Sequence, residues 1–218
     1  MMMQATMPHN VTSTNMNDVF DDIYSNNSWH GGGSGEGSTI AFNKATYIPF
    51  LKNYISDHQI KTVADIGSGD CQCLVDIYGD LDVTYFGYDC SKHIVTRTKE
   101  RFENHKYHFE LIDGNNPFVY IKNEVDLVIV KDVLQHWSNA RIHAFLSDLQ
   151  KRVRFKKCLL VNDVTHDRTL DIEDGKWRCI NWKDPFFNAF SFTTCLVYGS
   201  ALLKEVVEFK NNDLCSAL

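Results

Sequence analysis

The first candidate for chemistry is a glycine turn after a short apolar segment, which reads Asp65-Ile-Gly67-Ser68-Gly69. A buried strand that runs into two glycines two residues apart is typical of the first strand–turn–helix of a doubly wound α/β sheet, which binds ligands at its carboxyl edge. Glycine lets the backbone approach a ligand closely. A dinucleotide site needs a third glycine where this chain has Gln72. The turn therefore favours a ligand without a pyrophosphate.

A second group of reactive side chains follows the most apolar run of the chain, residues 125–130. Lys131, Asp132 and His136 lie within six residues there, where a buried parallel strand should end. His136 titrates near neutrality and could take a proton from an acceptor hydroxyl, or it could cap and pack the next helix; both interpretations stand. Asp132 is expected in the site because a carboxylate directly after a buried strand is costly without a partner. These three residues form the candidate catalytic group.

Two further acidic residues end expected strands. Asp89 lies about twenty residues after the glycines, the place where an acidic residue binds a ribose in doubly wound sheets. Its carboxylate can accept both hydroxyl hydrogens of a ribose diol, and it could also cap the following helix; the roles are compatible, and we favour the ribose. Asp113 opens an Asp-Gly-Asn-Asn-Pro run, which would form a turn in any case.

Residues 29–38 are rich in glycine and could be a flexible linker. They begin with a large aromatic side chain, Trp29, and lead directly into a segment with helical amphipathic spacing, Thr39 to Asp57. A linker needs neither feature. We therefore interpret residues 29–38 as an N-terminal lid whose Trp29, Ser34 and Gly35 lie at the ligand.

Hydrophobic periodicity predicts the elements that position these groups in an α/β fold. Residues 1–28 are expected to be a flexible segment with a short helix possible at Asp18–Tyr24, and residues 29–218 to be one domain with a substrate loop at 164–192. The strand that contains Val63 and Ala64 leads into the glycine turn. Further strands are expected at 83–89, 107–112, 125–130, 157–161, 193–199 and 203–210, and helices at 73–78, 91–104 and 141–153.

Two features near the end of the chain bear on the acceptor. Asn162 and Asp163 follow an expected strand and could converge with Asp132 on Mg²⁺, although ordinary turn chemistry is the preferred explanation. Aromatic side chains of the 164–192 loop could stack against a sugar or cover the edge of the core. These side chains are Trp177, Trp182, Phe186 and Phe187.

Composition excludes several classes of protein. The chain has 218 residues, 44% of them hydrophobic and 23% charged, which is ordinary for one globular domain. A net charge of −6 and a pI near 5.8 leave no electrostatic footprint for nucleic acid. No apolar run has the length of a membrane span, and the polar N-terminus does not look like a signal peptide. Seven cysteines without a CxxC pair indicate reduced thiols in the cytoplasm and make a zinc site unlikely.

The turn at Asp65–Gly69 resembles the first motif of class I S-adenosylmethionine-dependent methyltransferases, D/E-x-G-x-G-x-G, with Cys71 in place of the third glycine. The resemblance implies a Rossmann-like fold with a seven-stranded, mostly parallel sheet, an antiparallel C-terminal hairpin and helices on both faces. It also implies that the glycine turn and Asp65 hold the methionine end of the cofactor, that Asp89 holds the ribose, and that Asp113 approaches the adenine. Gly114 and Lys131 are included among the cofactor-binding candidates.

The lid and the Lys-Asp-Val-Leu-Gln-His segment that begins at Lys131 are similar to those of rhamnose-type sugar O-methyltransferases of bacteria and large DNA viruses. We therefore expect a cytoplasmic enzyme, in the host cytoplasm if the chain is viral, that methylates a sugar hydroxyl in a glycan. The alternatives are methylation of a small metabolite or protein, and a protein that binds the cofactor without turnover. A nucleotide-dependent oxidoreductase is disfavoured by Gln72. No oligomeric state is indicated.

Overall fold

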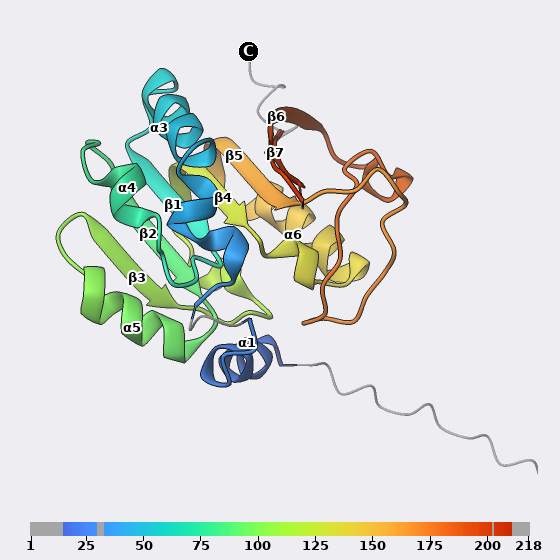
Figure 1. Cartoon of the computed structure of the whole chain (residues 1–218), viewed down its shortest axis with the longest axis horizontal. Coiled ribbons are helices and arrows are strands. Elements are labelled where there is room, and N and C mark those ends of the chain that lie inside the picture. The colour runs from blue at the N-terminus through green and yellow to red at the C-terminus, as the bar shows by residue number, and fades with distance from the viewer. Residues whose placement is uncertain (1–14, 30–32, 202, 211–218) are drawn as a thin grey trace, which may run out of the picture.

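The computed structural model of the chain describes residues 15–29, 33–201 and 203–210 (Figure 1). Its strands are β1 (Thr62–Ile66), β2 (Thr84–Asp89), β3 (Tyr107–Leu111), β4 (Glu124–Lys131), β5 (Arg154–Asp163), β6 (Phe192–Gly199) and β7 (Leu203–Phe209). Its α-helices are α1 (Met16–Ser25), α2 (Ile40–Asn43), α3 (Tyr47–Asp57), α4 (Leu74–Tyr78), α5 (Lys92–Phe102) and α6 (Asn139–Arg152). Short 3₁₀ turns are η1 (Glu36–Ser38), η2 (Pro117–Val119), η3 (Leu134–His136) and η4 (Pro185–Phe187).

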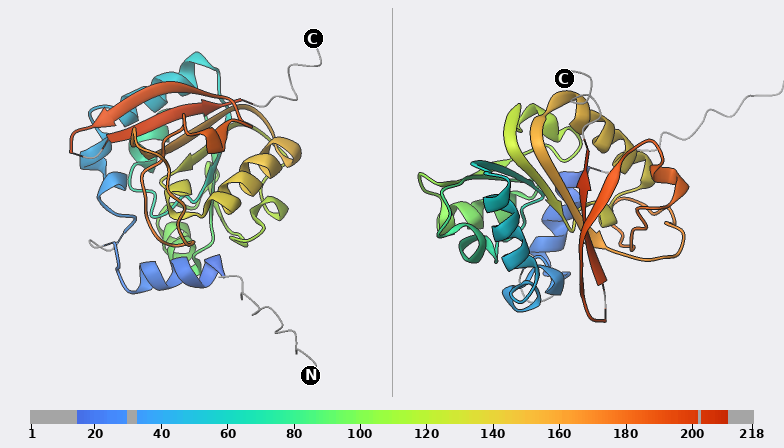
Figure 2. Two further views of the ribbon diagram at one scale, coloured as in Figure 1. Left: turned by 90° about the vertical axis from the view of Figure 1, so that its right-hand side faces the viewer. Right: turned by 90° about the horizontal axis from the view of Figure 1, so that it is seen from above.

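The seven strands form one sheet in the order β3-β2-β1-β4-β5-β7-β6. β1 to β5 are parallel neighbours, whereas β7 runs antiparallel to both β5 and β6. Figure 2 shows the β6–β7 hairpin along one margin of the sheet. The strand order reverses between β1 and β4, the switch point at which doubly wound sheets bind ligands. The predicted fold class, including the antiparallel hairpin, is confirmed.

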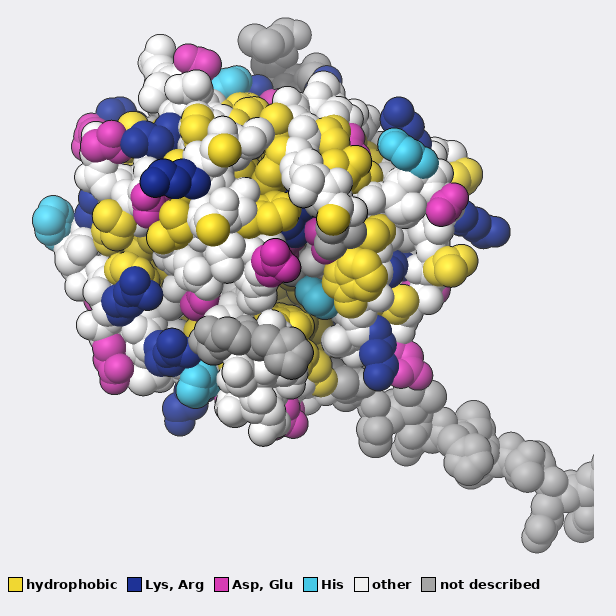
Figure 3. Space-filling view, in the orientation of Figure 1, with side chains coloured by type: hydrophobic (Ala, Val, Ile, Leu, Met, Phe, Trp, Pro, Cys, Tyr) yellow, Lys and Arg dark blue, Asp and Glu magenta, His cyan; other side chains and the backbone are white. Residues whose placement is uncertain are grey.

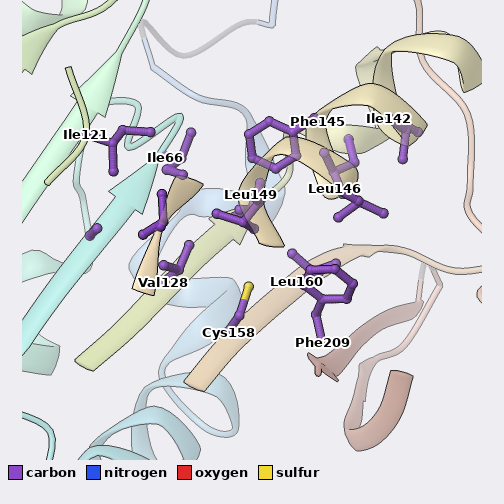
Figure 4. Close-up of a cluster of buried hydrophobic side chains, with 14 of the residues drawn as sticks. Ile66, Ile121, Val128, Ile142, Phe145, Leu146, Leu149, Cys158, Leu160 and Phe209 are labelled. Carbon is purple, nitrogen blue, oxygen red and sulfur yellow. The ribbon is translucent and has the colours of Figure 1, made fainter. Parts of the chain in front are cut away.

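Alternate residues of the central strands face two separate cores, because side chains alternate across a strand. Val128 and Leu160 pack with α6 on one face, as the close-up in Figure 4 shows. Leu127 and Leu159 pack on the other face with residues of α3, α4 and α5. Helices therefore cover both faces, and the sheet is buried along most of β4 and β5.

Helix α1 belongs to the folded domain and not to a flexible segment. Its N-cap Asn15 accepts a hydrogen bond from the Asn17 amide, and its Met16 and Phe20 are buried in the core on the α6 side. The helix expected at 18–24 is present as part of α1, and it packs on the domain that was predicted to begin at residue 29. Residues 1–14 lie outside the described residues, so the prediction for them stays a prediction.

The helix expected from Thr39 to Asp57 is broken into α2 and α3. Pro49 is the third residue of α3, inside the first turn, where proline is tolerated. Upstream continuation would require an amide hydrogen on Pro49 for the carbonyl of Ala45, and proline has none. The chain therefore bends at residues 44–46, and this bend places η1 and α2 over the sheet edge.

The segment from 164 to 192 is irregular apart from η4 and one bridge between Val164 and Ile180. Of its four flat aromatic side chains, Trp182 and Phe187 are buried in the core, and Phe186 packs on Phe187 with a centroid separation of 4.8 Å. The alternative that they cover the core edge is therefore correct for these three. Trp177 differs, since it is 51% exposed. In the described part of the chain, no helix is long and apolar enough to cross a bilayer.

Candidate functional site

A cavity of about 570 Å³ lies at the carboxyl ends of β1, β2 and β4. Figure 3 shows the hollow on this face, with acidic, basic and histidine side chains near its mouth. Every predicted site residue except Asp113 lines this cavity. The lining includes Trp29, Ser34, Gly35, Asp65, Gly67, Ser68, Gly69, Asp89, Gly114, Lys131, Asp132 and His136. The two candidate centres recognised in the sequence are therefore parts of one site.

The glycine turn needs glycine for both conformation and space. Gly67 and Gly69 have φ angles of +75° and +58°, which side chains disfavour. A Cβ at Gly67 would lie 2.3 Å from Cγ2 of Val133, and one at Gly69 would lie 2.3 Å from Oγ of Ser34. The turn is thus packed directly against the β4 loop and against the lid. Both contacts bring the cavity walls to the backbone of the turn.

Asp65 presents an unused acceptor to the cavity. Its Oδ2 accepts a hydrogen bond of 2.8 Å from the Tyr85 hydroxyl, while its buried Oδ1 has no partner in the described structure. Burial raises the Asp65 pKa to about 6, although Tyr85 and the charge of Lys131 act in the opposite direction. A buried acceptor without a donor is costly, so this position fits a ligand ammonium group, such as the amino group of the methionine part of S-adenosylmethionine.

Asp89 links β2 to the glycine turn. Its Oδ2 accepts from the Gly69 amide at 2.9 Å and its Oδ1 from the Ser91 amide at 2.9 Å. The cap of α5 is instead Ser91, whose hydroxyl accepts from the Ile94 amide. Burial raises the pKa of Asp89 to about 6, against the lowering effect of these amides. Each carboxylate oxygen keeps a second lone pair, so the group fits a ribose diol.

Asp113 is the one predicted site residue outside the cavity lining, and its carboxylate accepts from the Asn115 amide at 2.8 Å within its own turn. Its approach to an adenine stays a prediction. Gly114 does line the cavity, and its amide donates to Oδ1 of Asn17 at 2.9 Å. The Asn17 amide group also donates to the carbonyls of Cys90 and Ile112, each at 2.9 Å. Asn17 therefore fixes α1 as a wall of the cavity.

The described part of the lid is attached to the glycine turn. The Ser34 hydroxyl accepts from the Asp70 amide at 3.0 Å, and the Ser34 amide donates to the Asp70 carboxylate at 3.2 Å. The Tyr24 hydroxyl is 2.9 Å from the same Ser34 oxygen. The Trp29 ring lies 5.3 Å from that of His136. Residues 30–32 fall outside the described residues, and the role of this segment as a lid stays a prediction.

His136 lies in the cavity wall as a neutral imidazole. Its Nδ1 is 3.0 Å from the carbonyl oxygen of Lys176, and since a carbonyl only accepts, Nδ1 carries the proton. Nε2 is then left with a lone pair. Burial lowers the His136 pKa below its usual value, although the Lys176 carbonyl and two nearby carboxylates raise it. The ring is thus a base at neutral pH.

Asp132 belongs to a buried network of charges. Its Oδ2 pairs with Lys131, and its Oδ1 lies 2.5 Å from Nζ of Lys204. Burial opposes ionisation, but these two lysines outweigh it and hold the Asp132 pKa below its usual value. Asp132 has a φ of +59°, an uncommon conformation that aims its carboxylate at Lys204 and the lid. Lys131 also donates to the carbonyl of Gly37 in the lid at 3.1 Å.

Sequence reasoning missed Lys204 and gave Trp177 no special place. Lys204 is 2% exposed and lines the cavity. Its Nζ lies between Oδ1 of Asp132 and Oδ1 of Asp163, at 2.5 and 2.7 Å. Trp177 lines the cavity and donates from Nε1 to Oδ2 of Asp163 at 3.0 Å. The sequence offered one signal for Lys204, which is its place in a mostly apolar strand. A lysine that is buried in such a strand needs acidic partners.

An ammonium group occupies the position between the carboxylates where the Mg²⁺ hypothesis would place the metal ion. The space between Asp132 and Asp163 is filled by Nζ of Lys204. Asn162 faces elsewhere, since its Oδ1 accepts from the Gln135 amide at 3.1 Å. Among the described residues, no three His, Cys, Asp or Glu side chains are grouped as metal ligands.

Comparison with known proteins agrees with this fold. Residues 63–155 match a family model described as a methyltransferase domain. A SAM-dependent methyltransferase from Leishmania major is similar in structure, at 14% identity and a TM-score of 0.61 over 75% of this chain and 71% of that one. Magnesium protoporphyrin IX methyltransferase from Synechocystis PCC 6803, with bound SAH, gives 14% identity and a TM-score of 0.61 over 88% and 97%. No curated protein matches the sequence.

Proposed function

We propose that this chain, as a class I S-adenosylmethionine-dependent methyltransferase, transfers a methyl group to a sugar hydroxyl in a glycan. The observation that carries the proposal is His136, a neutral imidazole with a free Nε2 in a cavity shared with the exposed ring of Trp177 and a set of buried charges. A base beside an aromatic surface and fixed polar groups suits an acceptor with a C–H face and hydroxyls.

The cofactor end of the cavity is assigned to the glycine-turn side. Asp65 would accept from the amino group of the methionine part, and Asp89 from the ribose hydroxyls. Ile112, Gly114 and Met16, which line the same cavity, would enclose the adenine. Trp29 and Ser34 would close the cavity on its lid side, because Ser34 is hydrogen-bonded to Asp70 of the glycine turn. The protein would thus hold the cofactor mainly by shape and by two carboxylates.

S-adenosylmethionine supplies an electrophilic methyl group when bound. His136 takes the proton of the acceptor hydroxyl on Nε2 as the oxygen–carbon bond forms and the sulfur–carbon bond breaks. The products are the methyl ether, S-adenosylhomocysteine and one proton, which leaves from His136. Lys131 and Asp132 hold the lid through Gly37 and Ser38, so they position the acceptor and do not take its proton.

The acceptor end has the chemistry of a sugar site. Trp177 offers an exposed ring, and its Nε1 is fixed on Asp163. Glu36, Ser38 and Ser200 also line the cavity and supply hydrogen-bonding groups for hydroxyls. Sugars present an apolar C–H face together with hydroxyls, and this combination matches an aromatic ring rimmed by polar groups.

A small-metabolite acceptor is the second candidate, and the size of the cavity favours it. Its volume of about 570 Å³ lies within the range of roughly 300–1,000 Å³ that is usual for small-ligand sites. Cofactor and acceptor together would have to share that volume. A glycan would therefore enter by one terminal residue, whereas a small metabolite would be enclosed entirely.

The two candidates are separated by a methyl-transfer assay with isotope-labelled S-adenosylmethionine and mass spectrometry of the products. The panel contains methyl glycosides, nucleotide sugars and oligosaccharides ending in deoxy and ordinary hexoses, beside catechols and other small hydroxylated metabolites. A product one methyl group heavier among the sugars supports the proposal. Methylation confined to the non-sugar compounds would refute the sugar acceptor. Binding of S-adenosylhomocysteine without turnover of any compound would favour an inactive protein.

A further inference from the structure

Lys204 is a buried cation that the cofactor-binding role does not explain. It comes from β7, which pairs antiparallel with β5 so that Lys204 lies opposite Asp163. Asp132 reaches the same point from the end of β4. Burial disfavours the charged form of Lys204, but Asp132 and Asp163 outweigh this effect and raise its pKa above the usual value. Lys204 is therefore a permanent ammonium ion inside the site.

The two carboxylates are held rigidly around this ion. Oδ2 of Asp163 accepts from Trp177, and Oδ2 of Asp132 pairs with Lys131. Oδ1 of each carboxylate is thus left for Lys204. Two carboxylates that converge on one point, each fixed by a further donor, form the kind of arrangement that usually holds a divalent cation.

The ammonium ion keeps one donor free of the two carboxylates. A lysine carries three N–H groups, and the described structure uses two of them on Asp132 and Asp163. Lys204 lines the cavity, and its Nζ is close enough to the lid that a Cβ at Gly37 would lie 2.8 Å from it. The third N–H has no hydrogen-bond partner among the described residues; the Phe42 ring, whose centroid lies 5.8 Å from Nζ, lines the same cavity.

Lys204 and His136 line the same cavity. The charges of Asp132 and Asp163 raise the pKa of the imidazole, and the charge of Lys204 lowers it. An acceptor oxygen between them would meet an N–H on one side and a proton acceptor on the other. Such a pair lowers the energy of the developing negative charge on oxygen.

We infer that Lys204 is a built-in cation that binds the acceptor oxygen and takes the place of a divalent metal in this methyltransferase. The inference rests on the proposed hydroxyl acceptor. The O–H proton goes to Nε2 of His136, the oxygen forms its bond to the methyl carbon, and the sulfur keeps the electron pair of the broken bond. Lys204 donates to the oxygen throughout and neither gains nor loses a proton.

The first test needs no acceptor. Lys204→Ala leaves Asp132 and Asp163 facing an emptied position, so the variant should bind Mn²⁺, whereas the unmodified chain should not. Electron paramagnetic resonance of Mn²⁺ reports the bound ion, and calorimetry with S-adenosylhomocysteine confirms the fold. The control is Lys157→Met. Lys157 lies on β5, pairs with Glu208 of β7 at 3.0 Å and does not line the cavity. No Mn²⁺ binding by a folded Lys204→Ala variant would overturn the inference.

The second test uses whichever hydroxyl compound is methylated. Turnover of the unmodified chain should be unchanged by EDTA. Lys204→Met should lower kcat by at least about 100-fold, as the loss of one charge-stabilising donor does. Mg²⁺ or ethylammonium should restore part of the activity of Lys204→Ala. Activity that EDTA abolishes and Mg²⁺ restores in the unmodified chain, or a Lys204→Met kcat within about threefold of the Lys157→Met control, would refute the role.

Removing Lys204 alone leaves Oδ1 of both buried carboxylates without a donor and removes a charge that balances them, which can prevent folding. If Lys204→Met does not bind S-adenosylhomocysteine, the triple variant Asp132→Asn, Asp163→Asn, Lys204→Met replaces it with a neutral group of the same shape. We expect that variant to bind the product and to be inactive, and substantial activity would overturn the inference. If Mn²⁺ binds to Lys204→Ala while no sugar is methylated, only the sugar acceptor fails.

Discussion

Replacing His136 with asparagine separates its two possible duties. The imidazole Nδ1 donates to the carbonyl of Lys176 at 3.0 Å, and this bond holds the 171–178 part of the loop against η3. The side-chain amide of asparagine lies at about the position of Nδ1 and can keep that donation. It has no counterpart of Nε2. His136→Asn therefore preserves the packing role and removes the base.

The size of the effect follows from these roles. A positioned general base contributes about 10²–10⁴-fold to a rate, or about 3–5 kcal/mol of transition-state stabilisation. We expect kcat of His136→Asn to fall by at least about 100-fold, while the dissociation constant of S-adenosylhomocysteine changes less than about threefold. A purely structural His136 would leave kcat within about tenfold of the unmodified chain, because the asparagine keeps the bond to Lys176.

The assay is single-turnover methyl transfer with labelled S-adenosylmethionine, measured across pH. Burial lowers the pKa of His136 below 6.5, so the unmodified chain should have a flat rate above neutrality that falls as the pH drops through that lowered pKa. His136→Asn should lack this acidic limb. His143→Asn is the matched control, since that ring packs on Phe190 at a centroid separation of 5.0 Å and is outside the cavity lining.

A His136→Asn variant that retains activity within about tenfold and keeps the acidic limb of its pH profile would show that His136 is not the general base. In that case another group takes the proton, and the tautomer assigned to His136 serves only the loop. A fall in kcat accompanied by an equal loss of product affinity would instead show that the asparagine failed to maintain the cavity wall.

Three further predictions concern the glycine-turn side of the cavity. The Asp65 pKa is raised to about 6, so ionising this carboxyl group destabilises the ligand-free protein as the pH rises from 4 through 6. Asp65→Asn should therefore stabilise the ligand-free protein by about 2–3 kcal/mol at pH 7, and an unchanged melting temperature in thermal melts across pH would contradict this. Gly67→Ala should cost about 2–5 kcal/mol in urea unfolding, given its φ of +75° and the clash with Val133, and a loss below about 1 kcal/mol would contradict the packing. Asn17→Ala should speed hydrogen exchange across residues 16–25 but not across 47–57, since it removes three hydrogen bonds that attach α1.

The grouping of residues on the glycine-turn side of the cavity could be predicted from the sequence because its signals are local. The glycines, Asp65 and the start of the crossover helix lie within about ten residues and form one strand–turn–helix unit. Asp89 ends the adjacent strand, so its position at the same sheet edge follows from the parallel order. Asp113 also follows an expected strand, but it does not line the cavity, and its carboxylate accepts from the Asn115 amide of its own turn.

The acceptor end could not be predicted in the same way because its residues meet through long-range register. Lys204 reaches Asp163 only because β7 pairs antiparallel with β5 in one particular alignment, and a shift by one residue would turn it to the other face. Trp177 is set by hydrogen bonds between the long loop and η3, including the Arg178 amide on the Gln135 carbonyl at 3.1 Å. Neither the β5–β7 register nor the contact between the loop and η3 can be recognised from the amino-acid sequence alone.

The place of β7 between β5 and β6 has a consequence for how the enzyme matures. β6 is made before β7 on the ribosome, yet in the described sheet it pairs with β7 alone and reaches β5 only through β7. The glycine turn and Asp89, to which the cofactor is assigned, are translated more than a hundred residues before Lys204 emerges. A nascent or truncated chain that ends before residue 203 would contain the glycine turn and Asp89 but lack Lys204. With the role proposed for Lys204, such a chain would be inactive even if it bound the cofactor.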